Sequence, residues 1–176
     1  MRPTPARASD GQIQPSGQGQ AVREIVVAGA HGGAGTTTLA ILLRPSWDLG
    51  AVRRPAAGCP AIRSTGGRPL ALVSRNTVAA AARATAAVNA ITWQGERIAV
   101  LVIVSDGFPE PLAAGYRFQV LTPRVGAIVR VPFIASLRTA DDPAQADLPR
   151  KARRSIADIR AKAFAGTGRP APIRTP

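Results

Sequence analysis

The stretch from Glu24 to Leu43, EIVVAGAHGGAGTTTLAILL, constrains most strongly what this chain can fold into. Its short β-branched run suits a buried strand. The glycine-rich segment that follows lets the backbone turn tightly and approach a ligand closely. A run of threonines then opens an apolar helix, where hydroxyl groups cap free backbone N–H groups. Because exposed amides and the positive end of a helix attract anions, this stretch predicts a strand, a phosphate-binding loop and a helix.

The glycine-rich loop departs from the general phosphate-binding pattern at two positions. That pattern, the P-loop, reads G-x-x-x-x-G-K-S/T, in which the lysine reaches the β- and γ-phosphates and the hydroxyl binds Mg²⁺. In this chain Ala30 replaces the first glycine and Thr36 replaces the lysine, whereas Gly35 and Thr37 keep their places.

The loop resembles more closely the deviant P-loop of the ParA/MinD partition and positioning ATPases, K-G-G-x-G-K-S/T-T. Gly32, Gly33, Gly35, Thr37 and Thr38 match it, and His31 and Thr36 replace its two lysines. The resemblance implies ATP with Mg²⁺ as the cofactor and Thr37 as the Mg²⁺ contact. The implied nucleotide- or phosphate-binding residues are His31, Gly32, Gly33, Gly35, Thr36, Thr37 and Thr38. Because phosphoryl transfer depends mostly on electrostatic stabilisation, loss of both lysines predicts little or no hydrolysis.

Apolar runs alternate with helical patterns along the rest of the chain. The runs predict strands at residues 70–74, 98–104 and 127–131, and the 3.6-residue spacing predicts helices at 78–91, 112–121 and 147–165. Strands that alternate with helices indicate a mostly parallel sheet covered on both faces. We therefore expect an α/β fold, a three-layer P-loop-like domain whose small sheet has about four or more strands.

Residues 46–68 are rich in proline and glycine and have no sustained period, so we expect a long irregular connection there. Residues 1–20 are rich in Pro, Gly, Gln and Ser, which predicts a disordered segment. Residues 166–176 are similarly predicted to form a flexible tail. A length of 176 residues suits one domain, which we place at 21–165.

The resemblance to the ParA/MinD group continues more weakly in the later strands. The segment IAVLVIVSDG resembles a strand whose end carries a base-reading residue, and AIVRVPFIASLR resembles a final strand whose proline borders the adenine. This alignment implies that Asp106 and Pro132 lie near a base. A different alignment makes Asp106 the metal-side acid of a Walker-B-like strand, and Asp-Gly is also common turn chemistry. In either alignment the catalytic set is incomplete, since residues 46–68 contain one acid, Asp48.

The net charge of +13 comes almost entirely from arginine. An Ala/Arg-rich, Lys-poor composition is typical of a high-GC bacterium such as an actinobacterium. A strongly positive chain associates with nucleic acid or anionic membrane surfaces. Arg150, Lys151, Arg153 and Arg154 cluster at the start of the last predicted helix. Two interpretations are open, a solvated helix face or a contact with DNA phosphates.

Cys59 is the only cysteine and His31 the only histidine, so the sequence excludes a disulfide framework and multi-histidine or thiolate metal sites. No apolar run approaches the roughly 20 residues of a membrane span, and the N-terminus does not resemble a signal peptide. These features predict a cytoplasmic protein without a resident metal.

Three functions fit the sequence. The first is a nucleotide- or phosphate-binding accessory or regulatory factor that acts with a protein partner. The second is a basic DNA-associated protein with a vestigial loop. The third is an ATPase with rewired catalytic residues, in which either Arg75 at a strand end or an arginine of a partner supplies the lost cation. The family resemblance also implies a homodimer that shares a nucleotide site.

Overall fold

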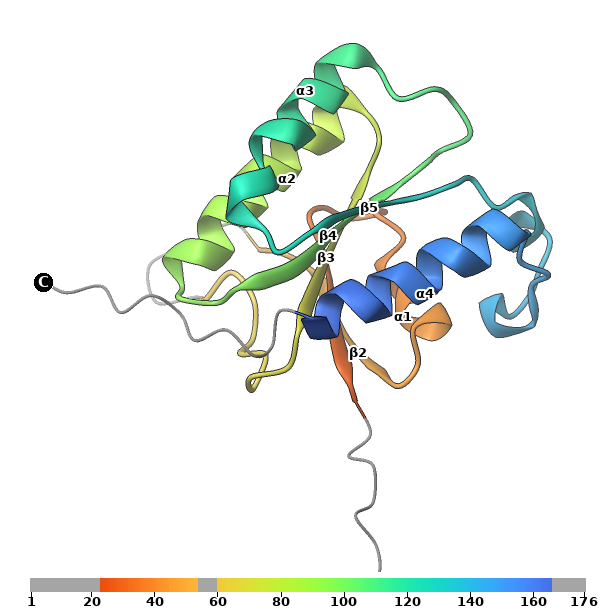
Figure 1. The fold of residues 1–176 in the computed structure, drawn as a ribbon, viewed down its shortest axis with the longest axis horizontal. Helices are drawn as coiled ribbons and strands as arrows, with labels where there is room; N and C mark the ends of the chain where they lie inside the picture. Colours follow the sequence, from red (N-terminus) through yellow and green to blue (C-terminus); the bar gives the residue numbers. More distant parts are fainter. Residues whose placement is uncertain (1–22, 54–59, 166–176) are drawn as a thin grey trace, which may run out of the picture.

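The computed structural model describes residues 23–53 and 60–165, and its centre is one sheet of five parallel strands in the order β2-β1-β3-β4-β5 (Figure 1). The strands are β1 (Ile25–Gly29), β2 (Ser46–Ala51), β3 (Leu70–Arg75), β4 (Ile98–Val104) and β5 (Ile128–Val131). The helices are α1 (Thr36–Leu42), α2 (Val78–Trp93), α3 (Leu112–Val120) and α4 (Arg150–Ala165). The predicted α/β class is confirmed, with four helices flanking the sheet.

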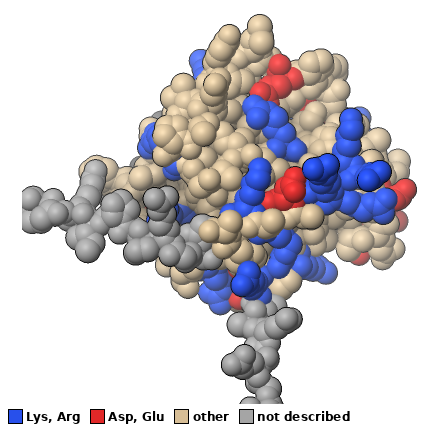
Figure 2. Space-filling model, viewed as in Figure 1, with Lys and Arg blue, Asp and Glu red and all other residues tan. Residues whose placement is uncertain are grey.

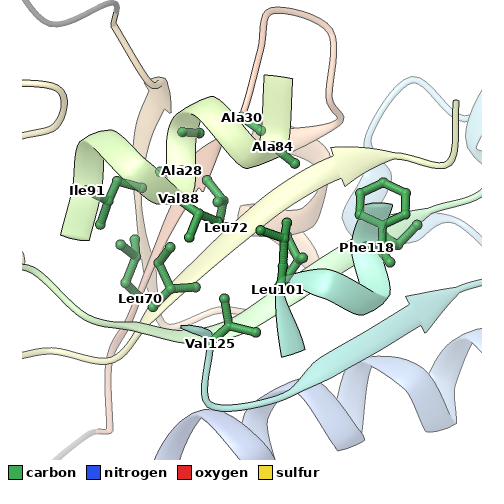
Figure 3. Close-up of a cluster of buried hydrophobic side chains, with 14 of the residues drawn as sticks. Ala28, Ala30, Leu70, Leu72, Ala84, Val88, Ile91, Leu101, Phe118 and Val125 are labelled. Carbon is green, nitrogen blue, oxygen red and sulfur yellow. The ribbon is translucent and has the colours of Figure 1, made fainter. Parts of the chain in front are cut away.

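The sheet separates two hydrophobic cores. Helices α2 and α3 cover one face, and α1 and α4 cover the other (Figure 1). Successive side chains of β1 point to opposite faces of the sheet and pack in different cores. Val26 packs with the α2 and α3 layer, and Val27 packs with the α1 and α4 layer. In the first core Leu72, Val88 and Phe118 converge between the sheet and the helices (Figure 3).

The central strands and α2 form where the sequence predicts them. β4 is buried on both faces, as its continuous apolar run indicates. α2 begins after Thr77, whose hydroxyl accepts a hydrogen bond from the Ala80 N–H at 3.2 Å. Thr77 is therefore the side-chain N-cap of α2.

The prediction of an irregular connection over residues 46–68 is wrong in its first part, because residues 46–51 form β2. This strand lies at the edge of the sheet and pairs only with β1. None of its side chains is fully buried, so its sequence, SWDLGA, lacks the apolar run by which buried strands are recognised. Cys59 lies outside the described residues.

The last helix begins later than predicted. Residues 147–149 precede it, and α4 starts directly after Pro149, whose carbonyl accepts a hydrogen bond from the Arg153 N–H. The predictions for residues 1–20 and 166–176 lie outside the described part of the chain. No helix within residues 23–53 and 60–165 combines the length and apolar character needed to cross a membrane.

Candidate functional site

The glycine-rich loop joins the end of β1 to the start of α1. Gly33 and Gly35 have φ values of 73° and 90°, a conformation that residues with a Cβ rarely adopt. Within residues 23–53 and 60–165, the backbone N–H groups of Gly35, Thr36 and Thr37 donate to no protein acceptor. Free amides at this turn are the donors that an anion requires.

Thr36, at the lysine position of the P-loop pattern, faces the protein. It is buried, and its hydroxyl oxygen lies so close to Gly29 that a Cβ on Gly29 would stand 2.3 Å from it. Gly29 is therefore required by the packing of Thr36. The next two residues differ, because Thr37 is exposed and Thr38 is half-buried at the wall of a cavity.

His31, at the position of the other family lysine, is held by two neighbours. Its Nδ1 lies 2.9 Å from the Gly32 carbonyl oxygen, and its Nε2 lies 3.5 Å from the Arg75 backbone N–H. A single neutral tautomer satisfies both contacts, with Nδ1 donating and Nε2 accepting. His31 thus links the loop to the end of β3.

A cavity of about 260 Å³ lies beside this loop, at the carboxyl ends of β3, β4 and β5. In open α/β sheets, ligands bind outside the carboxyl ends of the strands. The cavity brings together the predicted residues Gly35, Thr38, Asp106 and Pro132, which the sequence separates widely. The other predicted loop residues, His31, Gly32, Gly33, Thr36 and Thr37, do not line it.

Two arginines give the cavity a positive charge. Arg75, at the end of β3, lines it as one sequence interpretation expects. Arg138, which the sequence reasoning missed, also lines the cavity, with its guanidinium 5.1 Å from the Phe133 ring centroid. Neither arginine forms an ion pair within the described residues. The sequence could have indicated Arg138, because it lies in the segment that directly follows β5.

Asp106 is held in its turn by Asn76, a buried polar residue. The Asp106 N–H donates to Asn76 Oδ1 at 3.2 Å, and Asn76 Nδ2 donates to the Phe108 carbonyl at 3.0 Å. The Asp106 carboxylate itself accepts from the Phe108 N–H at 3.1 Å. These hydrogen bonds are those expected where Asp106 and Gly107 form a turn. One oxygen of the Asp106 carboxylate already accepts a hydrogen bond within that turn.

The basic residues at the start of α4 are all exposed, but only two of the four line a groove. Blue side chains gather over the first turns of α4 in Figure 2. Lys151 and Arg154 line a second groove of about 400 Å³ at the edge of β5, whereas Arg150 and Arg153 do not. Two carboxylates, Glu110 and Asp158, share that groove, so its charge is mixed. All four basic side chains are exposed.

Glu110 is paired with Arg130 at 2.8 Å beside the same groove. The hydrogen bond from Arg130 to the Glu110 carboxylate raises the pKa of the Arg130 guanidinium. Glu110 and Arg130 together therefore present little net charge to a ligand in this groove.

In the part of the chain that the structure describes, no three His, Cys, Asp or Glu side chains gather as metal ligands. Comparison of the chain with models of known protein families and with curated proteins finds no match.

Proposed function

We propose that this protein is a nucleotide- or phosphate-binding accessory or regulatory factor with little or no hydrolytic activity. The observation that supports this most is the cavity, where the first turn of α1 meets Arg75, Asp106 and Pro132. Free amides, the positive end of a helix and two arginines that form no ion pair within residues 23–53 and 60–165 favour an anionic ligand. The partial resemblance of the loop to the ParA/MinD P-loop favours ATP with Mg²⁺ among such ligands, with Thr37 as the Mg²⁺ contact.

The geometry argues against efficient phosphoryl transfer. Both lysine positions of the resembled pattern hold residues that face the protein, Thr36 against Gly29 and His31 against Arg75. Among the described residues, Asp106 is the only acid on the cavity wall, and its own turn uses its carboxylate. Because catalysis of phosphoryl transfer consists largely of placed charges, we infer binding without useful turnover.

The size of the cavity limits what it encloses. At about 260 Å³ it falls just below the roughly 300–1,000 Å³ typical of small-molecule sites. We therefore expect it to hold the phosphates closely and to leave part of a nucleotide exposed.

Calorimetric titration with ATP, ADP, GTP and inorganic phosphate, each with Mg²⁺, tests the proposal. The informative pair of variants is Thr38→Asp and Thr38→Asn, which have equal size and differ in charge. Thr38 is the third residue of α1, where a carboxylate favours the helix, so Thr38→Asp should fold normally. We expect saturable binding that weakens at least tenfold in Thr38→Asp and little in Thr38→Asn. Absence of binding at millimolar ligand, or equal binding by both variants, would overturn the proposal.

A second candidate is DNA association through α4, with the loop vestigial. The exposed cluster at the start of α4 in a chain of net charge +13 favours it (Figure 2). Replacement of Arg150, Lys151, Arg153 and Arg154 by glutamine should then reduce both DNA affinity and its salt dependence. The third candidate, a rewired ATPase, requires turnover that Thr37→Ala abolishes.

A further inference from the structure

Helix α3 exposes a stripe of large apolar side chains. Leu112, Tyr116 and Val120 are 80%, 67% and 72% exposed, and their spacing of four residues places them on one face. The opposite face of α3 is buried against the sheet through Ala114 and Phe118. The helix is therefore apolar on both its inner and its outer side. A surface helix that contacts only solvent on its outer side normally carries polar residues there.

The surface around this stripe carries little charge. Arg117 is the only charged residue of α3, and its guanidinium turns to α2 to donate to the Val78 carbonyl at 3.2 Å. At the N-terminal end of α3, Glu110 and Arg130 neutralise each other. The surface over α3 is largely tan in Figure 2, in contrast to that over α4. Depletion of charge with enrichment in aromatic and aliphatic side chains is typical of the core of a protein interface.

The area of this apolar surface can be compared with that of known protein interfaces. Phe108, in the loop before α3, is a further exposed aromatic residue, at 75%. The three side chains of the stripe offer roughly 400 Å² of accessible surface, within the range for the largest patch on a monomer. A groove of about 480 Å³ between α3 and the edge strand β5, lined in part by Leu112 and Tyr116, continues this surface. Two such surfaces, together with the walls of their grooves, approach the roughly 1,000 Å² that a specific interface buries.

We propose that this stripe binds a second copy of the chain, with the two α3 helices antiparallel about a two-fold axis near Tyr116. Leu112 and Val120 lie equally far from Tyr116 in sequence, so this arrangement places Leu112 of one copy against Val120 of the other. The two Tyr116 rings meet at the centre.

Charge favours a second copy over an unrelated partner. Two chains of +13 repel each other across most of their surface and approach most easily where charge is low. An acidic partner would instead be attracted to the basic clusters. The stripe lies on the α2 and α3 layer, whereas the cavity lies at the carboxyl ends of the strands, so this proposal stands independently of the proposed function.

Sedimentation velocity of the full-length chain over a range of concentrations tests the proposal. We expect a concentration-dependent species of twice the mass of one chain. Leu112→Glu and Val120→Arg should each weaken dimerisation at least tenfold, because each places a charge in the apolar interface. Trp47→Ala is the control, since Trp47 is an exposed aromatic residue on β2 at the other edge of the sheet. It should leave the dimer unchanged.

Mixing the two charged variants tests the antiparallel arrangement. In a mixed dimer the Glu at 112 faces the Arg at 120, and the remaining Leu112 and Val120 face each other. We expect the mixture to dimerise more strongly than either variant alone. A wild-type monomer at all concentrations, a dimer that both variants retain, or a mixture that stays as weak as its components would overturn the proposal. Circular dichroism spectra check that the variants fold.

Discussion

The side chains at the two lysine positions of the resembled P-loop both make contacts within the protein. Thr36 packs on Gly29, and His31 connects the Gly32 carbonyl to the Arg75 N–H. These contacts fix the loop without using the free amides of Gly35 and Thr37. The loop therefore keeps free backbone donors, but neither position holds the lysine that would promote transfer of a phosphoryl group in the resembled pattern.

The packing of Thr36 on Gly29 predicts a specific instability. Gly29→Ala should lower the free energy of unfolding by about 1–3 kcal/mol, the usual cost of overpacking. Removal of the hydroxyl with Thr36→Ala in the same chain should recover part of that loss. Gly32→Ala is the control, because a Cβ there meets no atom within 4 Å. Urea unfolding measures all four proteins, and equal stability of Gly29→Ala and Gly32→Ala would contradict the contact.

Asn76 is a buried polar residue whose side chain should contribute to the free energy of unfolding through its two hydrogen bonds. In Asn76→Asp the donor to the Phe108 carbonyl is lost and two oxygens face each other in a buried position. We expect a loss of about 1–3 kcal/mol in the free energy of unfolding, as for a buried acceptor left without its donor. Asn89→Asp, an exposed change on α2, should have little effect in the same thermal unfolding assay. A stable Asn76→Asp protein would show that Asn76 does not hold the Asp106 turn.

At the scale of elements, the parts that could be predicted from sequence are those whose burial follows a simple period. β4 is apolar throughout because both its faces are covered, and α2 begins at a threonine that caps it. β2 could not be predicted because an exposed edge strand needs no apolar residues. At the site, the loop was predictable from its glycines. The roles of Asn76 and Arg138 depend on contacts between distant segments and were not.

The connection before β3 is joined to β1 by an ion pair that acid should remove. Arg68 donates a hydrogen bond to the Glu24 carboxylate at 2.7 Å, and this bond lowers the pKa of Glu24. A lowered folded-state pKa stabilises the protein above the unfolded-state pKa, and the benefit is lost as the pH falls through the folded-state value. The difference in melting temperature between wild type and Arg68→Gln should therefore shrink from about pH 7 to about pH 3. A difference that is constant with pH would exclude this pair as its cause.

At the scale of the whole molecule, three surfaces differ in charge. The cavity has two arginines that form no ion pair within the described residues, the start of α4 is basic, and α3 is apolar and nearly uncharged. Because these surfaces are separate, the proposed anion binding, DNA contact and self-association would use different places on the molecule. The net charge of +13 acts on all three.

Salt should therefore affect two of these interactions in opposite directions. Added salt screens the repulsion between two positive chains, so the α3 dimer should strengthen. Association of α4 with DNA should weaken, because fewer counterions are released on binding. Sedimentation and fluorescence anisotropy over the same salt series measure the two effects. A dimer that dissociates with added salt would indicate that charged groups, and not the α3 stripe, hold it together.

The measurement that tests the central claim most directly is a titration of the ¹⁵N-labelled protein with ADP and Mg²⁺, followed by amide chemical shifts. Our account predicts saturable shifts at the amides of Gly35, Thr36 and Thr37, with accompanying shifts at Arg75. Shifts confined to the first turns of α4, or no shifts at millimolar ligand, would contradict it.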